Sequence, residues 1–156
     1  MKLLICSDSH GARRSLLRIA EKETPDVMLF LGDGLRDADY VAGRCPALQV
    51  LSVRGNCDYS LDGAPEDWLT EFEGVRIYLC HGHRYGVKTD LRRLRERGLS
   101  MGARLVLFGH THRPLLREEP EVTLLNPGSV GEGMTASYAV VRLSGGGRME
   151  CQLRSL

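Results

Sequence analysis

The most constraining feature of the sequence is a series of five polar segments, each of which follows a short apolar run. Their leading positions are 8, 33, 56, 81 and 110, so successive segments are 23 to 29 residues apart. That interval is about the length of one strand–connection–strand unit. Because ligands bind at the carboxyl edge of open α/β sheets, the spacing predicts that the segments converge at one edge. The five segments are Asp8-Ser9-His10, Gly32-Asp33-Gly34, Gly55-Asn56, His81-Gly82-His83 and Gly109-His110-Thr111-His112.

The residues between these segments predict an α/β fold. Strands are expected at the apolar runs 2–6, 26–31, 48–53, 68–72, 75–80, 104–108, 122–125, 137–143 and 149–153. Helices are expected over 15–22, over 37–43 and from a Thr89 cap to about Arg97. The first three strands alternate with helices and therefore predict a parallel sheet. The last three strands are expected to be antiparallel, with a turn at 145–147, and residues 57–66 are expected to be a loop.

Length and composition predict one globular domain over 1–156. Lys and Arg number 21 and Asp and Glu number 20, a balance that argues against nucleic acid or an anionic membrane as a partner. The apolar runs are far shorter than the roughly 20 residues of a membrane span, and the first run ends too early for a signal peptide. Five cysteines without a C-x-x-C pair are typical of free thiols in a reducing cytoplasm, where we expect the protein.

All five histidines of the chain lie in the polar segments, together with two carboxylates and one amide. Each segment alone is also typical of a helix cap or a turn, but turn chemistry does not explain why every histidine follows a strand. A mixed set of imidazole, carboxylate and carbonyl donors suits Mn, Fe, Ni or Zn. Seven donors exceed the four that one zinc takes, so two divalent ions are expected, with Asp33 as the bridge. The seven are Asp8, His10, Asp33, Asn56, His81, His110 and His112.

The five segments resemble the calcineurin-like metallophosphoesterases, whose pattern is D-x-H, GD, GN, H and GHxH in this order. The segment 55–58, Gly-Asn-Cys-Asp, is similar to that of the small YfcE-type phosphodiesterase branch of that family. The resemblance runs from residue 8 to residue 112 and extends through Asn126-Pro127-Gly128-Ser129 to the C-terminal strands. It implies a four-layer α/β/β/α sandwich of two mixed sheets, and small members of the family suggest a homo-oligomer.

The resemblance also implies how the donors divide between the two ions. One ion would be held by Asp8, His10, Asp33 and His112. The other would be held by Asp33, Asn56, His81 and His110. Larger phosphatases of the family carry a histidine where this chain has Cys57, which leaves the protonation of the leaving group to another residue. Manganese is the favoured metal, with Ni, Fe and Zn as alternatives.

The predicted reaction is hydrolysis of a small phosphate diester by a hydroxide that bridges the two metals, with inversion at phosphorus and without a covalent intermediate. Asp33, Asn56 and His83 are the predicted catalytic residues. His83 is the candidate for contacting the phosphate or the leaving group, and a merely structural histidine is the alternative. Cys57 is expected to pack as a small hydrophobe, and Asp58 either orients a ligand or caps a turn.

Two other functions are compatible with the same residues. A phosphomonoesterase or nucleotidase needs an additional cation near the site, which Arg13, Arg54 or Arg113 would supply. A non-catalytic protein-binding scaffold is the second alternative, because the fold serves that purpose in the retromer subunit. The basic stretch 88–97 is expected to be an amphipathic helix with a solvated face rather than a nucleic-acid site.

Overall fold

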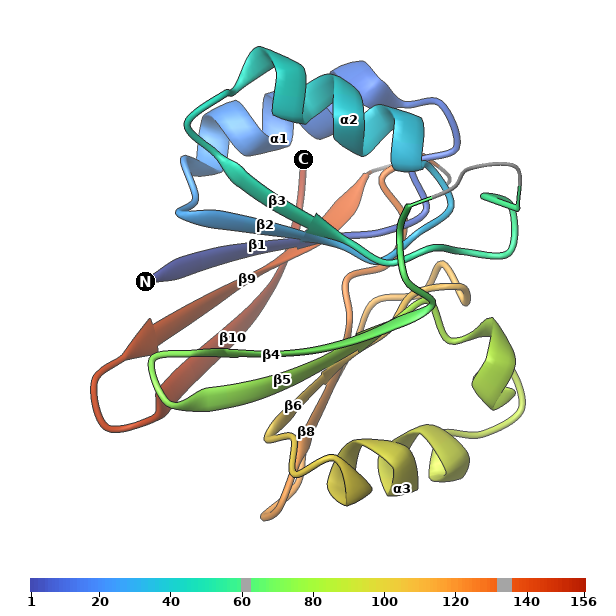
Figure 1. Cartoon of the computed structure of the whole chain (residues 1–156), viewed down its shortest axis with the longest axis vertical. Coiled ribbons are helices and arrows are strands. Elements are labelled where there is room, and N and C mark those ends of the chain that lie inside the picture. Colours follow the sequence, from blue (N-terminus) through green and yellow to red (C-terminus); the bar gives the residue numbers. More distant parts are fainter. Residues whose placement is uncertain (60–62, 132–135) are drawn as a thin grey trace.

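The computed structural model describes residues 1–59, 63–131 and 136–156, and these form two five-stranded sheets (Figure 1). The first sheet contains β1 (Lys2–Cys6), β2 (Val27–Phe30), β3 (Gln49–Ser52), β9 (Ser137–Ser144) and β10 (Arg148–Ser155). The second contains β4 (Asp67–Phe72), β5 (Val75–Cys80), β6 (Leu105–Leu107), β7 (Leu115–Glu118) and β8 (Thr123–Asn126). The strand orders are β10-β9-β1-β2-β3 and β4-β5-β6-β8-β7.

Helices cover the outer face of each sheet. Figure 1 shows α1 (Arg13–Glu23) and α2 (Leu35–Arg44) against the first sheet, and α3 (Arg92–Ser100) against the second. A short 3₁₀ helix, η1 (His83–Tyr85), follows β5. Both sheets are mixed, since β1 is parallel to β2 and antiparallel to β9, and β8 is parallel to β6 and antiparallel to β7. The predicted α/β/β/α sandwich is confirmed.

The apolar runs are continuous because each central strand is buried on both of its faces. In β1, Leu3 and Ile5 belong to the core between the two sheets, whereas Leu4 and Cys6 pack against α1 and α2. The second sheet follows the same rule, with its even-numbered outer residues, such as Tyr78, facing α3. Burial on both faces fixes the register of these strands and hence the positions at which they end.

The carboxyl ends of the strands form the edge that the sequence spacing predicts. The parallel registers Ile5↔Leu29 and Leu29↔Leu51 align the ends of β1, β2 and β3. In the second sheet, β5, β6 and β8 are aligned in the same way. The backbone N–H of His110 donates to Asp8 Oδ2 (3.1 Å), which joins the loop after β6 to the loop after β1. The polar segments of both sheets therefore meet.

Four features differ from the sequence prediction. The strand expected at 122–125 is β8, which belongs to the second sheet and is parallel to β6 instead of continuing the antiparallel tail. The edge strand β7 and the 3₁₀ helix were not anticipated. The helix α3 begins at Arg92 rather than after a Thr89 cap, because the Asp90 carboxylate accepts the N–H of Arg92 (2.9 Å) and Thr89 N–H donates to Gly86.

Candidate metal centre

Asp8 lies at the middle of the polar cluster and is fully buried. Its Oδ2 accepts hydrogen bonds from the Ser7 hydroxyl and from the backbone N–H of His110, which fix the carboxylate. Its Oδ1 faces three imidazoles. The Nε2 atoms of His112, His10 and His81 lie 3.0, 3.7 and 3.8 Å from Oδ1. One carboxylate oxygen is thus held by the protein, and the other is turned to the imidazole cluster.

Asp33 approaches two of the same imidazoles from the neighbouring loop. Its Oδ2 lies 3.4 Å from His81 Nε2 and 3.8 Å from His10 Nε2, and its Oδ1 accepts the N–H of Cys57 (2.8 Å). Burial favours the neutral acid, but hydrogen bonding and charge from His81 and the N–H of Cys57 outweigh it, so the pKa of Asp33 is held well below its usual range. Asp33 is therefore a carboxylate at neutral pH, shared between two imidazoles.

His81 is oriented by the backbone. Its Nδ1 lies 2.7 Å from the carbonyl oxygen of Leu31, so in the neutral ring Nδ1–H donates there and the Nε2 lone pair faces the two carboxylates. This is the arrangement in which a histidine commonly binds a metal, with its other nitrogen bound to a backbone carbonyl. Although burial opposes the charged form, Asp33 and Asp8 raise the pKa of His81 in the metal-free protein.

His110 and His83 stand next to His81. The ring centroids of His81 and His110 are 5.1 Å apart, and those of His81 and His83 are 5.4 Å apart. Burial, followed by the charges of His81 and Lys88, lowers the pKa of His110 to about 4. Burial and the His81 charge also lower the pKa of His83. Both rings are therefore neutral near pH 7 and have lone pairs available.

Within the described residues, three groups of possible metal donors have ligand atoms within 4.8 Å of one another. They are Asp8/His10/His112, Asp8/Asp33/His81 and His10/Asp33/Cys57. Five of the seven predicted ligands thus lie in such groups. His110 is adjacent through its ring contact with His81, and Asn56 is one residue from Cys57, with its amide donating to Cys57 Sγ at 3.5 Å.

Cys57 contradicts its sequence-based interpretation. It was expected to pack as a small hydrophobe, but it is exposed and its thiol lies beside Asp33 and His10. The adjacent carboxylate of Asp33 helps to explain why the pKa of Cys57 is raised, after the effect of burial. Its place directly after Asn56 in the third polar segment was the sequence signal for this proximity.

Of the two roles that the sequence left open, Asp58 performs the positioning one, and it also caps the start of a helix, which the sequence did not predict. Its buried carboxylate accepts the backbone N–H groups of Asp33 (2.7 Å), Gly34 (3.0 Å), Leu35 (3.2 Å) and Gly55 (2.9 Å). Two of these residues stand at the start of α2, where a negative charge is favourable. The same carboxylate therefore caps the helix and ties the loop that carries Asp33 to the loop that carries Asn56.

The loop backbone at this edge is strained at the positions of the predicted ligands. Seven non-glycine residues have positive φ in the described part of the chain, and five of them are predicted ligands: Asp8, His10, Asp33, His110 and His112, with φ from 43° to 67°. A left-handed conformation costs such residues roughly 1–2 kcal/mol each. Strain of this kind gathers at functional sites, where the surrounding structure enforces it.

The glycines of the second and third segments allow two loops to touch. A Cβ at Gly32 would lie 2.5 Å from Gly55 N, and a Cβ at Gly55 would lie 2.1 Å from Asp33 Oδ1. Neither position has room for a side chain. The Gly-Asp and Gly-Asn pairs of the sequence are thus explained by the close approach of the two loops around Asp33.

The donors fit a divalent cation. Asp8 Oδ1 and His81 Nε2 are buried, and neither makes a hydrogen bond with the part of the protein that the structure describes. Buried polar atoms without a partner are rare in native proteins, and a cation between this oxygen and this nitrogen would satisfy both. Carboxylate and imidazole donors together suit Mn, Fe, Ni and Zn.

The chain belongs to the calcineurin-like phosphoesterase superfamily, whose domain model matches residues 1–146. It is 35% identical over 150 residues to the probable metallophosphoesterase YsnB of Bacillus subtilis, covering 92% of this chain and 85% of the relative. It is 30% identical over 168 residues to phosphodiesterase YfcE of Escherichia coli, covering 90% and 87%. The family and its metal dependence agree with the fold and the donor cluster.

Among solved structures, the fold is similar to Vps29 from Entamoeba histolytica complexed with zinc. The TM-score is 0.79 at 21% identity, and the alignment covers 99% of each chain. Within the described residues, no helix has the length and apolar character needed to cross a membrane.

Proposed function

We propose that this chain is a phosphodiesterase that uses two divalent metal ions to hydrolyse a small phosphate diester. The observation that carries the proposal is the pair of buried carboxylates, Asp8 and Asp33, that face the same imidazoles with unsatisfied donor atoms between them. The phosphodiesterase name of the relative from E. coli supports a diester as the substrate class.

Seven residues would hold the two ions. Asp8, His10, Asp33 and His112 form the first set, and Asp33, Asn56, His81 and His110 form the second, with Asp33 common to both. When bound, such ions supply positive charge for the phosphoryl oxygens and lower the pKa of a coordinated water. We favour manganese, with Ni, Fe or Zn as alternatives.

The chain's own residues set the charge and the orientation of this centre. Asp8 and Asp33 bring two negative charges, which leaves the loaded site positive enough for a diester that carries one. The Leu31 carbonyl holds the tautomer of His81, and Asp58 fixes the loop of Asp33. Each of these positions a donor before the substrate arrives, which lowers the reorganisation needed during the reaction.

His83 is the residue that we propose to contact the departing group. It lies beside His81 and His110, and its Nε2 is 3.7 Å from Glu66 Oε2. Glu66 is held in turn by Arg54, with Nη2 to Oε1 at 2.9 Å. His83 Nδ1 is buried and makes no hydrogen bond with the described residues.

A phosphomonoesterase is the second candidate, and one arginine favours it. Of the three arginines named for this role, Arg13 lies over the Tyr40 ring (4.9 Å) and Arg54 is paired with Glu66. The guanidinium of Arg113 has no ion pair within the described residues and lines a cavity next to His112. For a protein-binding scaffold, the likeness to Vps29 supports the fold only. The unsatisfied buried donors favour a bound cation, as the metal-dependent enzyme requires.

The protein would act in the cytoplasm, as its five free cysteines suggest, without a membrane or nucleic-acid partner and with a homo-oligomer as its expected assembly.

A hydrolysis assay on metal-stripped protein tests the proposal. Bis-p-nitrophenyl phosphate and p-nitrophenyl phosphate are supplied in parallel with Mn, Ni, Zn or no metal. We expect metal-dependent turnover of the diester, reduced at least a hundredfold in Asp33→Asn because a shared metal donor is weakened. Asp39→Asn, an exposed change on α2, is the matched control and keeps the activity.

Turnover of the monoester alone would select the phosphomonoesterase. If the folded protein hydrolyses neither substrate with any of the metals, the protein-binding scaffold becomes the favoured function.

A further inference from the structure

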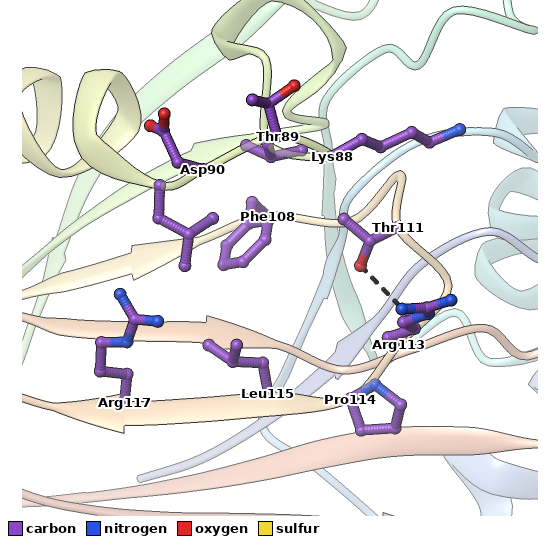
Figure 2. A pocket seen from close by; sticks show the side chains of 11 residues that line it. Lys88, Thr89, Asp90, Phe108, Thr111, Arg113, Pro114, Leu115 and Arg117 are labelled. Atoms are coloured by element: carbon purple, nitrogen blue, oxygen red, sulfur yellow. Dashed lines mark hydrogen bonds between the residues drawn. The ribbon is translucent and has the colours of Figure 1, made fainter.

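A cavity of about 830 Å³ lies beside the candidate metal centre, between residues 87–91 and the segment that leads from β6 into β7 (Figure 2). Its apolar lining includes Val87 and Phe108, which belong to the core beneath α3, and the partly buried Leu115 on β7. A volume of this size is typical of sites that bind small organic molecules. None of the seven predicted metal ligands lines the cavity.

The cavity and the metal centre share one loop. Thr111 lines the cavity, and its two neighbours in the chain, His110 and His112, are predicted metal ligands. One turn therefore contributes residues to both sites. The turn is fixed because Thr111 Oγ1 accepts the N–H of Arg113 (3.3 Å) and the side-chain amide of Asn126 (3.0 Å).

The polar lining of the cavity is predominantly positive. Lys88, Arg113 and Arg117 contribute three cations, and Asp90 contributes the one carboxylate in the lining. No ion pair is formed by these three cations within residues 1–59, 63–131 and 136–156. Other basic side chains of the protein do have carboxylate partners, such as Arg54 with Glu66 and Arg95 with Glu119.

Figure 2 shows how the cations are distributed around the apolar floor. Lys88 and Arg113 lie on the side of the Thr111 turn, whereas Arg117 lies on the far side, beyond Leu115 and Phe108. A ligand that spans the cavity from the metal centre would pass apolar side chains and then meet a guanidinium. The apolar side chains and the guanidinium of Arg117 therefore follow one another along the cavity, with increasing distance from the metal centre.

We propose that this cavity binds one substituent of the phosphate diester, and that the preferred substituent has an apolar body ending in an anionic group, a carboxylate or a second phosphate. The inference rests on the proposed function and narrows its substrate class. The apolar body would pack against Phe108 and Leu115, and the terminal anion would bind Arg117 on the far side of the cavity, whose planar guanidinium group suits carboxylate and phosphate.

Matched substrates test this preference. We would compare 4-nitrophenyl 4-carboxyphenyl phosphate with 4-nitrophenyl 4-carbamoylphenyl phosphate, which have the same leaving group and nearly the same shape. We expect kcat/KM to favour the carboxylate about tenfold, as one charge-assisted contact would produce. Replacing the carboxylate by a phosphonate distinguishes the two anion sources, and the phosphonate should be preferred at least as strongly.

Variants test whether the cavity is the source of the preference. In Arg113→Ala/Arg117→Ala, the carboxylate-to-amide ratio of kcat/KM should fall to within about twofold of one. The single change Arg117→Gln removes the charge with little change in side-chain length, and it should also reduce the carboxylate-to-amide ratio of kcat/KM. Arg18→Ala, an equal loss of charge on the exposed side of α1, should keep the wild-type ratio.

The two proposals fail in different ways. A ratio near one in the wild type, with both diesters hydrolysed, overturns the cavity assignment and leaves the phosphodiesterase intact. A tenfold ratio that persists without Arg113 and Arg117 also overturns it. If neither diester is hydrolysed, an NMR titration of the metal-free protein with benzoate and with benzamide tests the cavity. Backbone amide shifts in residues 87–91 and 113–117 that benzoate produces and benzamide does not would support the cavity assignment. Absence of these shifts would overturn it.

Discussion

The two sheets contribute different chemistry to the same edge. The loops after β1, β2 and β3 supply both buried carboxylates and the amide, whereas the loops after β5 and β6 supply four of the five histidines. The carboxylate loops are tied down by further carboxylates: Asp58 accepts four backbone N–H groups, and Asp37 accepts the Ser9 hydroxyl and the Gly11 N–H. The imidazole loops depend mainly on backbone contacts and on Asn126.

This difference extends to the helices. In the first half, α1 is attached through a buried cluster in which Glu23 binds Lys2, Arg154 and the Tyr138 hydroxyl. In the second half, α3 is attached to the loop after β7 through the half-exposed pair Arg95–Glu119. The loops of the first sheet therefore hold its carboxylates firmly in place, and the second half leaves a cavity between residues 87–91 and β7 for a ligand.

The largest expected effect comes from Asp58, which holds the carboxylate loops together. Asp58→Ala leaves four backbone N–H groups without their acceptor, and we expect a loss of about 3 kcal/mol or more in the free energy of unfolding. Metal affinity should fall at least tenfold, because Asp33 is no longer held in place. Urea denaturation and calorimetric metal titration measure the two effects, with Asp39→Ala as the control. An unchanged metal affinity in folded Asp58→Ala would disprove the positioning role.

The second-largest expected effect is a pH dependence of folding stability, which arises from Glu23 in the first half of the molecule. Although burial opposes ionisation, hydrogen bonds from Lys2, Tyr138 and Arg154 lower the pKa of Glu23 from 4.5 to about 2. Because the folded pKa is depressed, its stabilisation is complete above about pH 5 and is lost as the pH falls towards 2. The difference corresponds to about 3 kcal/mol.

Denaturation of wild type and Glu23→Gln at pH 7, 4 and 2.5 measures this contribution. The difference between the two proteins should shrink as the pH falls, and a constant difference would contradict the assignment.

A pair of glycine substitutions tests the contact between the carboxylate loops. Gly55→Ala places a methyl group 2.1 Å from Asp33 Oδ1 and should destabilise the protein by about 2 kcal/mol. Gly43→Ala, in α2 with open space around it, should instead stabilise by up to about 1 kcal/mol. Equal effects of the two changes, measured by urea denaturation, would show that the loops are not packed as described.

The smallest effect is expected for the attachment of α3. Glu119→Gln removes the nearer of the two carboxylate partners of the half-exposed Arg95, and ion pairs near the surface contribute less than about 1 kcal/mol. The loss should decrease further in 1 M salt, which screens exposed charges. A loss as large as that of Glu23→Gln would remove the distinction between the two halves.

Much of the fold could be predicted because the strand ends carry unusual residues. The positions of Asp8, Asp33 and His81 after apolar runs located the edge of the sheets, and burial on both faces made those runs easy to recognise. The direction and sheet of β8 could not be predicted, because they depend on pairing with β6 rather than on local sequence. The edge strand β7 is short and half charged, so it has little apolar signal.

The exposure of Cys57 and the four backbone N–H groups that Asp58 accepts could not be predicted from the sequence. Both depend on how two loops approach each other, and the glycines that permit this approach also fit ordinary turns.

The left-handed backbone at Asp8, His10, Asp33, His110 and His112 has an evolutionary consequence. Aspartate, asparagine, histidine and glycine tolerate that conformation better than other residues do. A descendant of this fold that lost its chemistry would still experience selection for these residue types, simply in order to fold. Among distant members of the superfamily, an intact Asp or His at these positions is therefore weak evidence of retained catalysis. His81 and Asn56 do not have a left-handed backbone, so their positions are more informative to compare.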